Sequence, residues 1–133
     1  MKFMLIVKAT KETEAGAPPT NDELVAMHNY NEELQKAGIL LELGGLAPSS
    51  QAARIRFEGS KRTVTDGPFA EAKEMIAGFS IIQVKSREEA IEWAKRSPFG
   101  TEVHRHSPIE VEIRQLMSPE DYEPAAGEQP GKS

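Results

Sequence analysis

The pattern of apolar and polar residues predicts the secondary-structure elements of this chain. Short apolar runs predict strands, clusters of turn residues predict loops, and apolar residues at helical spacing predict helices. Residues 2–8 form a short, mostly apolar run that is typical of a strand buried on both faces. Residues 9–19 contain Gly and two Pro residues and are typical of a loop. In the next segment, apolar positions recur at intervals of three and four, which is the spacing of one helix face. That face holds Leu24, Met27, Asn31 and Leu34.

Both ends of this helix carry recognisable signals. Thr20 and Glu23 have the spacing of a capping box, in which a hydroxyl and a carboxylate each accept a hydrogen bond from a free backbone amide. Lys36 falls in the last turn, and Gly38 stands where a left-handed residue closes a helix. The sequence therefore predicts a helix from Thr20 to the residues before Gly38.

A strand over residues 39–43 and a hairpin follow. Residues 53–57 alternate between apolar and polar, Gly59 and Ser60 form a two-residue turn, and residues 62–65 return. Such a turn fixes the register of the two strands. It predicts the pairs Glu58–Lys61, Ile55–Val64 and Ala53–Asp66, with Asp66 on the same face as Ile55 and Val64.

The last third of the chain repeats the strand–helix–strand order. Residues 77–84 read as a strand, and Ser86 with Glu89 forms a second capping box before a helix that Pro98 ends. Residues 109–117 alternate strongly, with Ile109, Val111 and Ile113 on one face. Residues 118–133 are rich in Pro, Gly and Glu and predict a loose C-terminal tail.

This order of elements predicts an α+β, ferredoxin-like βαββαβ domain over residues 1–117, with an inserted β-hairpin. Both helices would cover one face of the sheet, which leaves the other face open. The apolar alternation of Ile109, Val111 and Ile113, beside the strands of residues 3–7 and 79–84, indicates that this open face is apolar. Such a face is unfavourable in water, so a homodimer in which two open faces stack is expected.

Composition narrows the class of protein. The chain has 133 residues, 38% of them hydrophobic and 28% charged, which fits one globular domain. The net charge of −5 argues against nucleic acid as a partner, and the absence of Cys excludes disulfides and a thiol nucleophile. The N-terminal apolar run is too short for a membrane span or a signal peptide, so no membrane partner and a cytoplasmic location are expected.

Residues 65–74 combine a turn with several charged groups. Asp66 ends the hairpin, Gly67 and Pro68 break the strand, and Glu71, Lys73 and Glu74 follow. One interpretation is a loop that presents Asp66, Glu71 and Lys73 to a ligand, with Lys73 paired to one of the acids. The alternative is a solvated loop in which Asp66 caps its own turn.

The histidines offer weaker candidates for chemistry. Glu102, His104 and His106 would share one face of an extended chain, and such a set could bind zinc. A polar loop before the last strand is the favoured interpretation, so neither a metal nor another cofactor is predicted.

The loop also carries a resemblance. The residues Asp66-Gly67-Pro68-Phe69-Ala70-Glu71, Lys73-Glu74 and Gly78-Phe79 resemble the YCII-related family in its DGPF branch, and the similarity extends over residues 2–117. The resemblance implies a dimeric α+β barrel. Some YCII-like relatives act as dehydrochlorinases through a His–Asp pair whose His lies on the first helix. Met27 stands at that position here and His28 follows it, so the resemblance points to Asp66, with His28 as a less direct candidate.

Three functions remain open from the sequence. The first is a small-molecule-binding protein or a lyase that transfers protons, with Asp66 and His28 as catalytic candidates. The second is a regulatory or interaction module, because the resemblance implies association with extracytoplasmic-function sigma factors. The third is a structural dimer. Whether the protein is an enzyme is left open. The ligand-binding candidates are Met27, Phe69, Glu71, Lys73 and Phe79.

Overall fold

A computed structural model describes residues 1–101 and 108–122 of the chain. Its strands and helices follow in the order β, α, α, β, β, β, β, α, β, with short 3-10 turns between some of them. The elements are β1 (Lys2–Lys8), α1 (Lys11–Glu14), α2 (Asn21–Lys36), β2 (Leu40–Gly45), η1 (Ser49–Gln51), β3 (Ala53–Glu58), β4 (Lys61–Asp66), η2 (Ala72–Glu74), β5 (Ile76–Gln83), α3 (Arg87–Lys95), β6 (Val111–Gln115) and η3 (Pro119–Tyr122).

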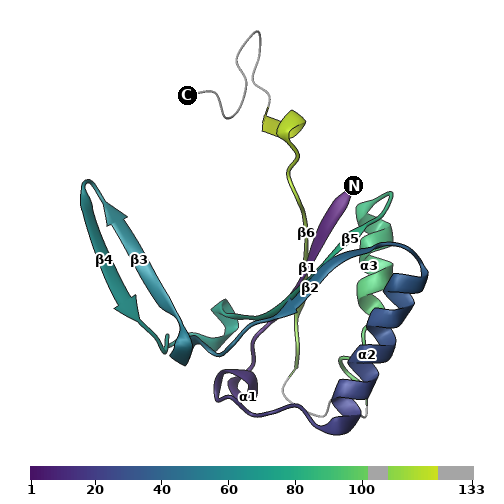
Figure 1. The fold of residues 1–133 in the computed structure, drawn as a ribbon, viewed down its shortest axis with the longest axis horizontal. Helices are drawn as coiled ribbons and strands as arrows, with labels where there is room; N and C mark the ends of the chain where they lie inside the picture. The colour runs from purple at the N-terminus through teal and green to yellow at the C-terminus, as the bar shows by residue number, and fades with distance from the viewer. Residues whose placement is uncertain (102–107, 123–133) are drawn as a thin grey trace.

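Four of the strands form one antiparallel sheet in the order β2-β5-β1-β6. Helices α2 and α3 lie on one face of this sheet, as Figure 1 shows. This is the order of a ferredoxin-like sheet, so the predicted βαββαβ arrangement with an inserted hairpin is confirmed. No second copy is present, and the dimeric barrel stays a prediction.

The helix ends follow the predicted caps closely. The Glu23 carboxylate accepts a hydrogen bond from the Thr20 amide at 2.9 Å, and the Thr20 hydroxyl accepts one from the Glu23 amide at 3.2 Å. Gly38 has φ of 73°, a backbone conformation that costs glycine little. At α3 the cap is only half as predicted, because Ser86 accepts from the Glu89 amide while the Glu89 carboxylate accepts from Lys85.

The core lies between the two helices and the sheet. Phe3, Leu34 and Ile82 are its largest fully buried side chains. Burial of each such side chain contributes about 2 kcal/mol of hydrophobic stabilisation. The core cluster consists of Phe3, Leu5, Tyr30, Leu34, Ile82, Val84 and Ala90.

The last strand, β6, orients its apolar residues differently from what the dimer argument assumed. Val111 and Ile113 pack against the core under the helices and do not contribute to the open face. Alternation along a strand shows which residues share a face, but the face that the helices choose depends on the whole sheet. The open face instead carries the side chains of Met4, Ile6, Phe79 and Ile81, which pair across β1 and β5.

The segment expected to be a loop over residues 9–19 contains the short helix α1. Thr10 caps it, because its hydroxyl accepts a hydrogen bond from the Thr13 amide at 3.2 Å. The Thr13 hydroxyl in turn accepts from the Thr10 amide at 2.8 Å. A Thr at both positions makes a capping box without the usual Glu or Gln, and this sequence signal was missed.

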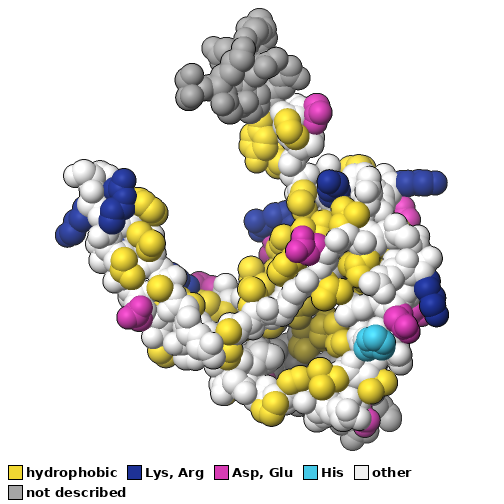
Figure 2. Space-filling view, in the orientation of Figure 1, with side chains coloured by type: hydrophobic (Ala, Val, Ile, Leu, Met, Phe, Trp, Pro, Cys, Tyr) yellow, Lys and Arg dark blue, Asp and Glu magenta, His cyan; other side chains and the backbone are white. Residues whose placement is uncertain are grey.

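Strands β3 and β4 form a separate two-stranded hairpin, called the arm below (residues 53–66). Its register is as predicted, with Glu58 opposite Lys61, Ile55 opposite Val64 and Ala53 opposite Asp66. The arm projects from the body of the protein, and all of its residues are exposed (Figures 1 and 2). The described residues of the same chain therefore leave Ile55 and Val64 uncovered.

None of the helices in the described ranges has both the length and the apolar character that crossing a membrane requires. The predicted division into a domain of residues 1–117 and a tail of residues 118–133 stays a prediction. The described start of the tail forms the 3-10 turn η3.

Candidate functional site

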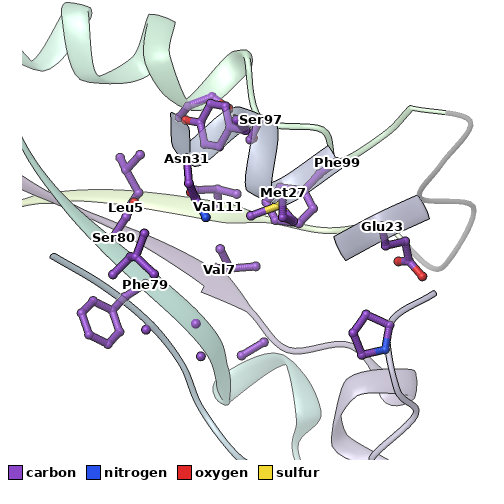
Figure 3. Close-up of a pocket in the computed structure, with 18 of the residues that line it drawn as sticks. Leu5, Val7, Glu23, Met27, Asn31, Phe79, Ser80, Ser97, Phe99 and Val111 are labelled. Atoms are coloured by element: carbon purple, nitrogen blue, oxygen red, sulfur yellow. Dashed lines mark hydrogen bonds between the residues drawn. The ribbon is translucent and has the colours of Figure 1, made fainter. Parts of the chain in front are cut away.

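A cavity of about 460 Å³ lies between α2, the helix-covered face of the sheet and the chain after α3 (Figure 3). Its floor is formed by β1, β5 and β6 through Leu5, Val7, Ser80 and Val111. Met27 and Asn31 line it from α2, and Phe99 closes one side. A volume of this size accommodates a small organic molecule.

Glycines in β2 and β5 create much of this space. Gly78 lies opposite Val7 in the sheet and therefore on the face that the helices cover. Its other neighbour across the sheet is Gly45, so two adjacent positions lack side chains where a core residue would otherwise fill the gap. A Cβ at Gly78 would lie 3.0 Å from the Gly44 carbonyl oxygen, so the strands also approach too closely for a larger residue.

Two polar side chains of the lining have no hydrogen-bond partner within the described part of the chain. They are Asn31 from α2 and Ser80 from β5. Figure 3 shows Asn31 extending from the helix into the space above the strands. Ser80 lies opposite Leu5, which places it on the helix-covered face. Partly buried amide and hydroxyl groups gain from a partner, so both are suited to anchor a ligand.

The other polar groups of the cavity are engaged within the protein. The Tyr30 hydroxyl donates a hydrogen bond of 2.7 Å to the Trp93 carbonyl, and burial raises the pKa of Tyr30 to about 12. Ser97 donates to the Ala94 carbonyl at 2.5 Å. The Glu23 carboxylate, in a residue only 5% exposed, caps α2 through the Thr20 amide.

The charge of the lining restricts the kind of ligand. Among the described residues that line the cavity, Glu23 is the one with a formal charge, and none is Lys, Arg or His. The lining is otherwise mostly apolar. Among these described residues an anion would find no counter-charge to compensate its desolvation. This part of the lining therefore fits an uncharged molecule better than an acid.

The loop over residues 65–74 does not reach this cavity and holds the base of the arm. The Gly67 amide donates to the Ala52 carbonyl at 2.8 Å, and the Phe69 amide donates to the Ser49 hydroxyl at 3.1 Å. Ser49 is 4% exposed and donates in turn to the Glu14 carboxylate through both its hydroxyl and its amide. These contacts connect α1, η1 and the loop into one network.

Further contacts of this loop are also structural. A Cβ on Gly67 would lie 1.8 Å from the Ser49 carbonyl oxygen, so only glycine fits at this close approach. The Arg54 guanidinium carbon stands 3.7 Å from the centroid of the Phe69 ring, which is cation–π geometry. The loop thereby joins the arm to the body on both sides of Gly67.

The predicted site residues divide into two groups. Met27 and Phe79 line the cavity. The Phe79 ring, however, lies on the open face of the sheet, where a Cβ at Gly44 would come within 3.0 Å of it. Phe69 is half-buried under Arg54, away from the cavity.

The charged candidates lie outside the cavity. Asp66, Glu71 and Lys73 are exposed and do not line it. Lys73 makes no ion pair within the described residues, so the expected pairing with a loop acid is not formed in the single chain. His28 is also exposed, with its Nε2 atom 3.9 Å from a Glu32 carboxylate oxygen on the outer side of α2. The structure does not bring Asp66 and His28 together in this cavity.

The candidate metal ligands Glu102, His104 and His106 fall in residues 102–107, outside the described ranges. Within those ranges, no three His, Asp or Glu side chains converge as a metal site requires.

Sequence reasoning missed Asn31 and Ser80 as site residues. Each is a polar residue within an otherwise apolar pattern: Asn31 follows Leu24 and Met27 on the helix face, and Ser80 interrupts the apolar run of β5. This interruption was the available signal. It indicates that a polar group faces inward, but it does not indicate that glycines of β2 and β5 leave space for a ligand next to that group.

Comparison with known proteins gives three findings. A family model described as the YCII-related domain matches residues 1–113. An uncharacterized protein of Rhizobium meliloti is 40% identical over 60 residues, which are 45% of this chain and 48% of that protein. The chain thus spans about half the length of the curated relative that it matches.

The third finding is a solved structure. It is 5-chloro-2-hydroxyhydroquinone dehydrochlorinase from Burkholderia phenoliruptrix in complex with 2,5-dihydroxybenzoquinone. The match covers 90% of this chain and 97% of that chain, with 16% identity and a TM-score of 0.49. A likeness at this level says nothing about the activity of the present chain.

Proposed function

This chain belongs to the YCII-related family, and we propose that it is a homodimeric protein that binds a small, uncharged, mainly apolar molecule in the cavity between α2 and the sheet. The observation that carries this proposal is the combination of an apolar space of about 460 Å³ with two inward polar groups that lack partners in the described chain, Asn31 and Ser80. A few placed polar groups in an apolar cavity are the usual composition of a small-molecule site.

The polar pair sets the orientation of the ligand. An amide both donates and accepts, and a hydroxyl does the same, so a molecule with one hydroxyl or carbonyl edge and an apolar body satisfies both. A phenol has this form. Its ionised counterpart of similar size, a benzoate, places a negative charge in a lining whose charged residue in the described part is Glu23.

A binding experiment tests this function directly. Isothermal titration with phenol, catechol and benzoate is expected to show binding of the uncharged compounds and none of benzoate. Asn31→Ala should weaken binding about tenfold, because it removes one hydrogen bond. Asn29→Ala is the matched control, because Asn29 is an exposed residue of the same helix and does not line the cavity.

A variant that blocks the cavity gives a second test of the binding site. Ser80→Leu places a larger apolar side chain where the ligand would lie and should abolish binding while the protein stays folded. Equal binding by wild type, Asn31→Ala and Ser80→Leu would show that the ligand lies elsewhere, and no binding of any of these compounds would contradict the proposed ligand class.

Proton-transfer chemistry at Asp66 is the competing form of this function. Solvated carboxylates make weak catalysts, so proton transfer by the exposed acids of the loop requires that a second protein surface cover them. Asp66→Asn separates the two sites: it should leave cavity binding unchanged, whereas loss of binding or turnover at unchanged melting temperature would assign the ligand to the loop.

The homodimer part of the proposal rests on the open sheet face. Of its central residues, Met4, Phe79 and Ile81 are half-buried, and Ile6 is buried, with 7% of its surface exposed. Stacking of two such faces would remove this apolar surface from water. Sedimentation equilibrium at micromolar concentration should give the mass of a dimer, and a well-folded monomer would refute it.

A further inference from the structure

The arm has one mainly apolar face, which also carries Arg62 and Asp66, and one polar face. Ile55, Phe57 and Val64 share a face and are 55%, 66% and 63% exposed. The opposite face carries residues such as Arg56 and Thr63, which pair across the two strands. A two-stranded hairpin alone in water is marginally stable, and apolar side chains of this size on one face are typical of a surface that becomes covered.

The direction of the arm is fixed at its base. The hydrogen bonds from Gly67 to Ala52 and from Phe69 to Ser49, at 2.8 and 3.1 Å, join the segment directly after the arm to the segment directly before it. The close approach of Gly67 to the Ser49 carbonyl allows little space for rotation. The apolar face is therefore held in one orientation rather than carried on a free loop.

The open face of the sheet looks towards the side on which the arm projects. In Figure 1 the helices lie on one side of the sheet and the arm on the other. Figure 2 shows open space between the arm and the body. One chain thus has two apolar surfaces, the arm face and the open sheet face, on either side of a recess that its own described residues do not fill.

We propose that the arm of one copy covers the open sheet face of a second copy, and that the two copies exchange arms in this way. A two-fold axis places each arm opposite the sheet of the other chain, so that both surfaces are covered at once and the assembly closes as a dimer. This inference rests on the proposed homodimer and adds the arm as the element that holds it.

The areas of the two surfaces support a second copy of the chain as the partner that covers them. Two strands of six residues make a face about 20 Å long and about 10 Å wide, or roughly 200 Å². Each copy gives one such face and receives another, which is about half of the roughly 800 Å² that each partner buries in a specific dimer. Direct contact between the sheets supplies the rest. Loss of the arm contacts should therefore weaken the dimer.

Substitutions on the two faces of the arm test the proposal. The double variant Phe57→Thr and Val64→Thr keeps strand-forming residues but removes the apolar face. It is expected to raise the dimer dissociation constant at least tenfold in sedimentation equilibrium. The matched control, Arg56→Thr and Thr63→Ser, changes the opposite face and should leave the constant within twofold. Circular dichroism and a thermal melt establish that both variants are folded.

Cross-linking gives a readout that does not depend on affinity. The chain has no Cys, so introduced thiols are the sole targets of a bis-maleimide. A mixture of Phe57→Cys and Met4→Cys proteins should give a cross-linked heterodimer, because the proposal places the arm face of one copy on the partner's β1. Arg56→Cys mixed with Met4→Cys should give much less product.

The outcomes separate this inference from the proposed function. A monomeric wild type would overturn both the dimer and the arm exchange. A dimeric wild type whose dissociation constant is the same in the Phe57/Val64 variant, without cross-linking from position 57, would overturn the arm exchange and leave the stacked-sheet dimer standing. Capture of a different protein by the arm of a monomeric chain would likewise overturn it.

Discussion

The backbone amide of Phe69 donates a hydrogen bond of 3.1 Å to the hydroxyl of Ser49, twenty residues earlier in the chain. Ser49 is buried, and its hydroxyl donates onward to the Glu14 carboxylate. The signature loop after the arm is thus positioned by a serine and an acid that lie in two other segments. In the single chain, its contacts fit a joint between arm and body better than a catalytic loop.

Replacement of Ser49 tests this joint. Ser49→Ala leaves the Phe69 amide and a Glu14 carboxylate oxygen without their partner, which should lower the free energy of unfolding by about 2 kcal/mol. Ser50→Ala is the matched control, because the neighbouring Ser50 is exposed and makes no side-chain hydrogen bond within the described residues. Urea unfolding of both variants measures the difference. Equal stability would show that the network contributes nothing to the fold.

Gly67 provides a steric test of the same joint. A Cβ there would lie 1.8 Å from the Ser49 carbonyl oxygen, so Gly67→Ala forces two backbone segments apart. We expect a loss of about 2–3 kcal/mol, as for other overpacked positions. Gly45→Ala is the control for stability, since a Cβ at Gly45 meets no atom within 4 Å. If Gly67→Ala unfolds at the same urea concentration as Gly45→Ala, the close approach is not present in solution.

Tyr30 predicts a change of stability in alkaline solution. Burial raises the pKa of Tyr30 from 10.0 to about 12, so the folded protein holds this proton more tightly than the unfolded chain. The contribution is complete below pH 10 and is lost as the pH rises through 12. The resulting loss of stability is about 1 kcal/mol at pH 11 and about 2 kcal/mol at pH 12.

The pH dependence is measured by urea unfolding of wild type and Tyr30→Phe at pH 8 and pH 11. The variant lacks the hydrogen bond to the Trp93 carbonyl at both pH values, so it is less stable throughout. The gap between the two proteins should narrow by about 1 kcal/mol at pH 11, because only the wild type loses the tyrosine proton. A constant gap would mean that Tyr30 titrates as an exposed phenol does.

Local signals predicted the fold well. The helix start at Thr20 and Glu23 depends on contacts three residues apart, and the register of the arm depends on a two-residue turn. Alternation also gave the side-chain partition of β6 correctly. It did not show which face the helices cover, and Val111 was therefore assigned to the wrong surface.

The candidate site was harder to predict because the cavity depends on two glycines, which have no side chain to fill the space. The cavity exists where Gly45 and Gly78 meet beneath α2, and neither residue is unusual in its own strand. The charged loop attracted attention because Asp66, Glu71 and Lys73 are close in sequence. In the folded chain they are exposed, since their segment lies at the base of the arm, away from α2 and α3.

The strand order has a consequence for how the chain forms during synthesis. β1 leaves the ribosome before its two neighbours in the sheet, β5 and β6, whose paired residues lie 68 to 81 and 104 to 112 positions later. β1 therefore remains unpaired until the segments of β5 and β6 have emerged. Its residues Phe3, Leu5 and Ile6, which are buried in the folded chain, stay exposed during that period, which makes the nascent segment of β1 a natural substrate for a chaperone.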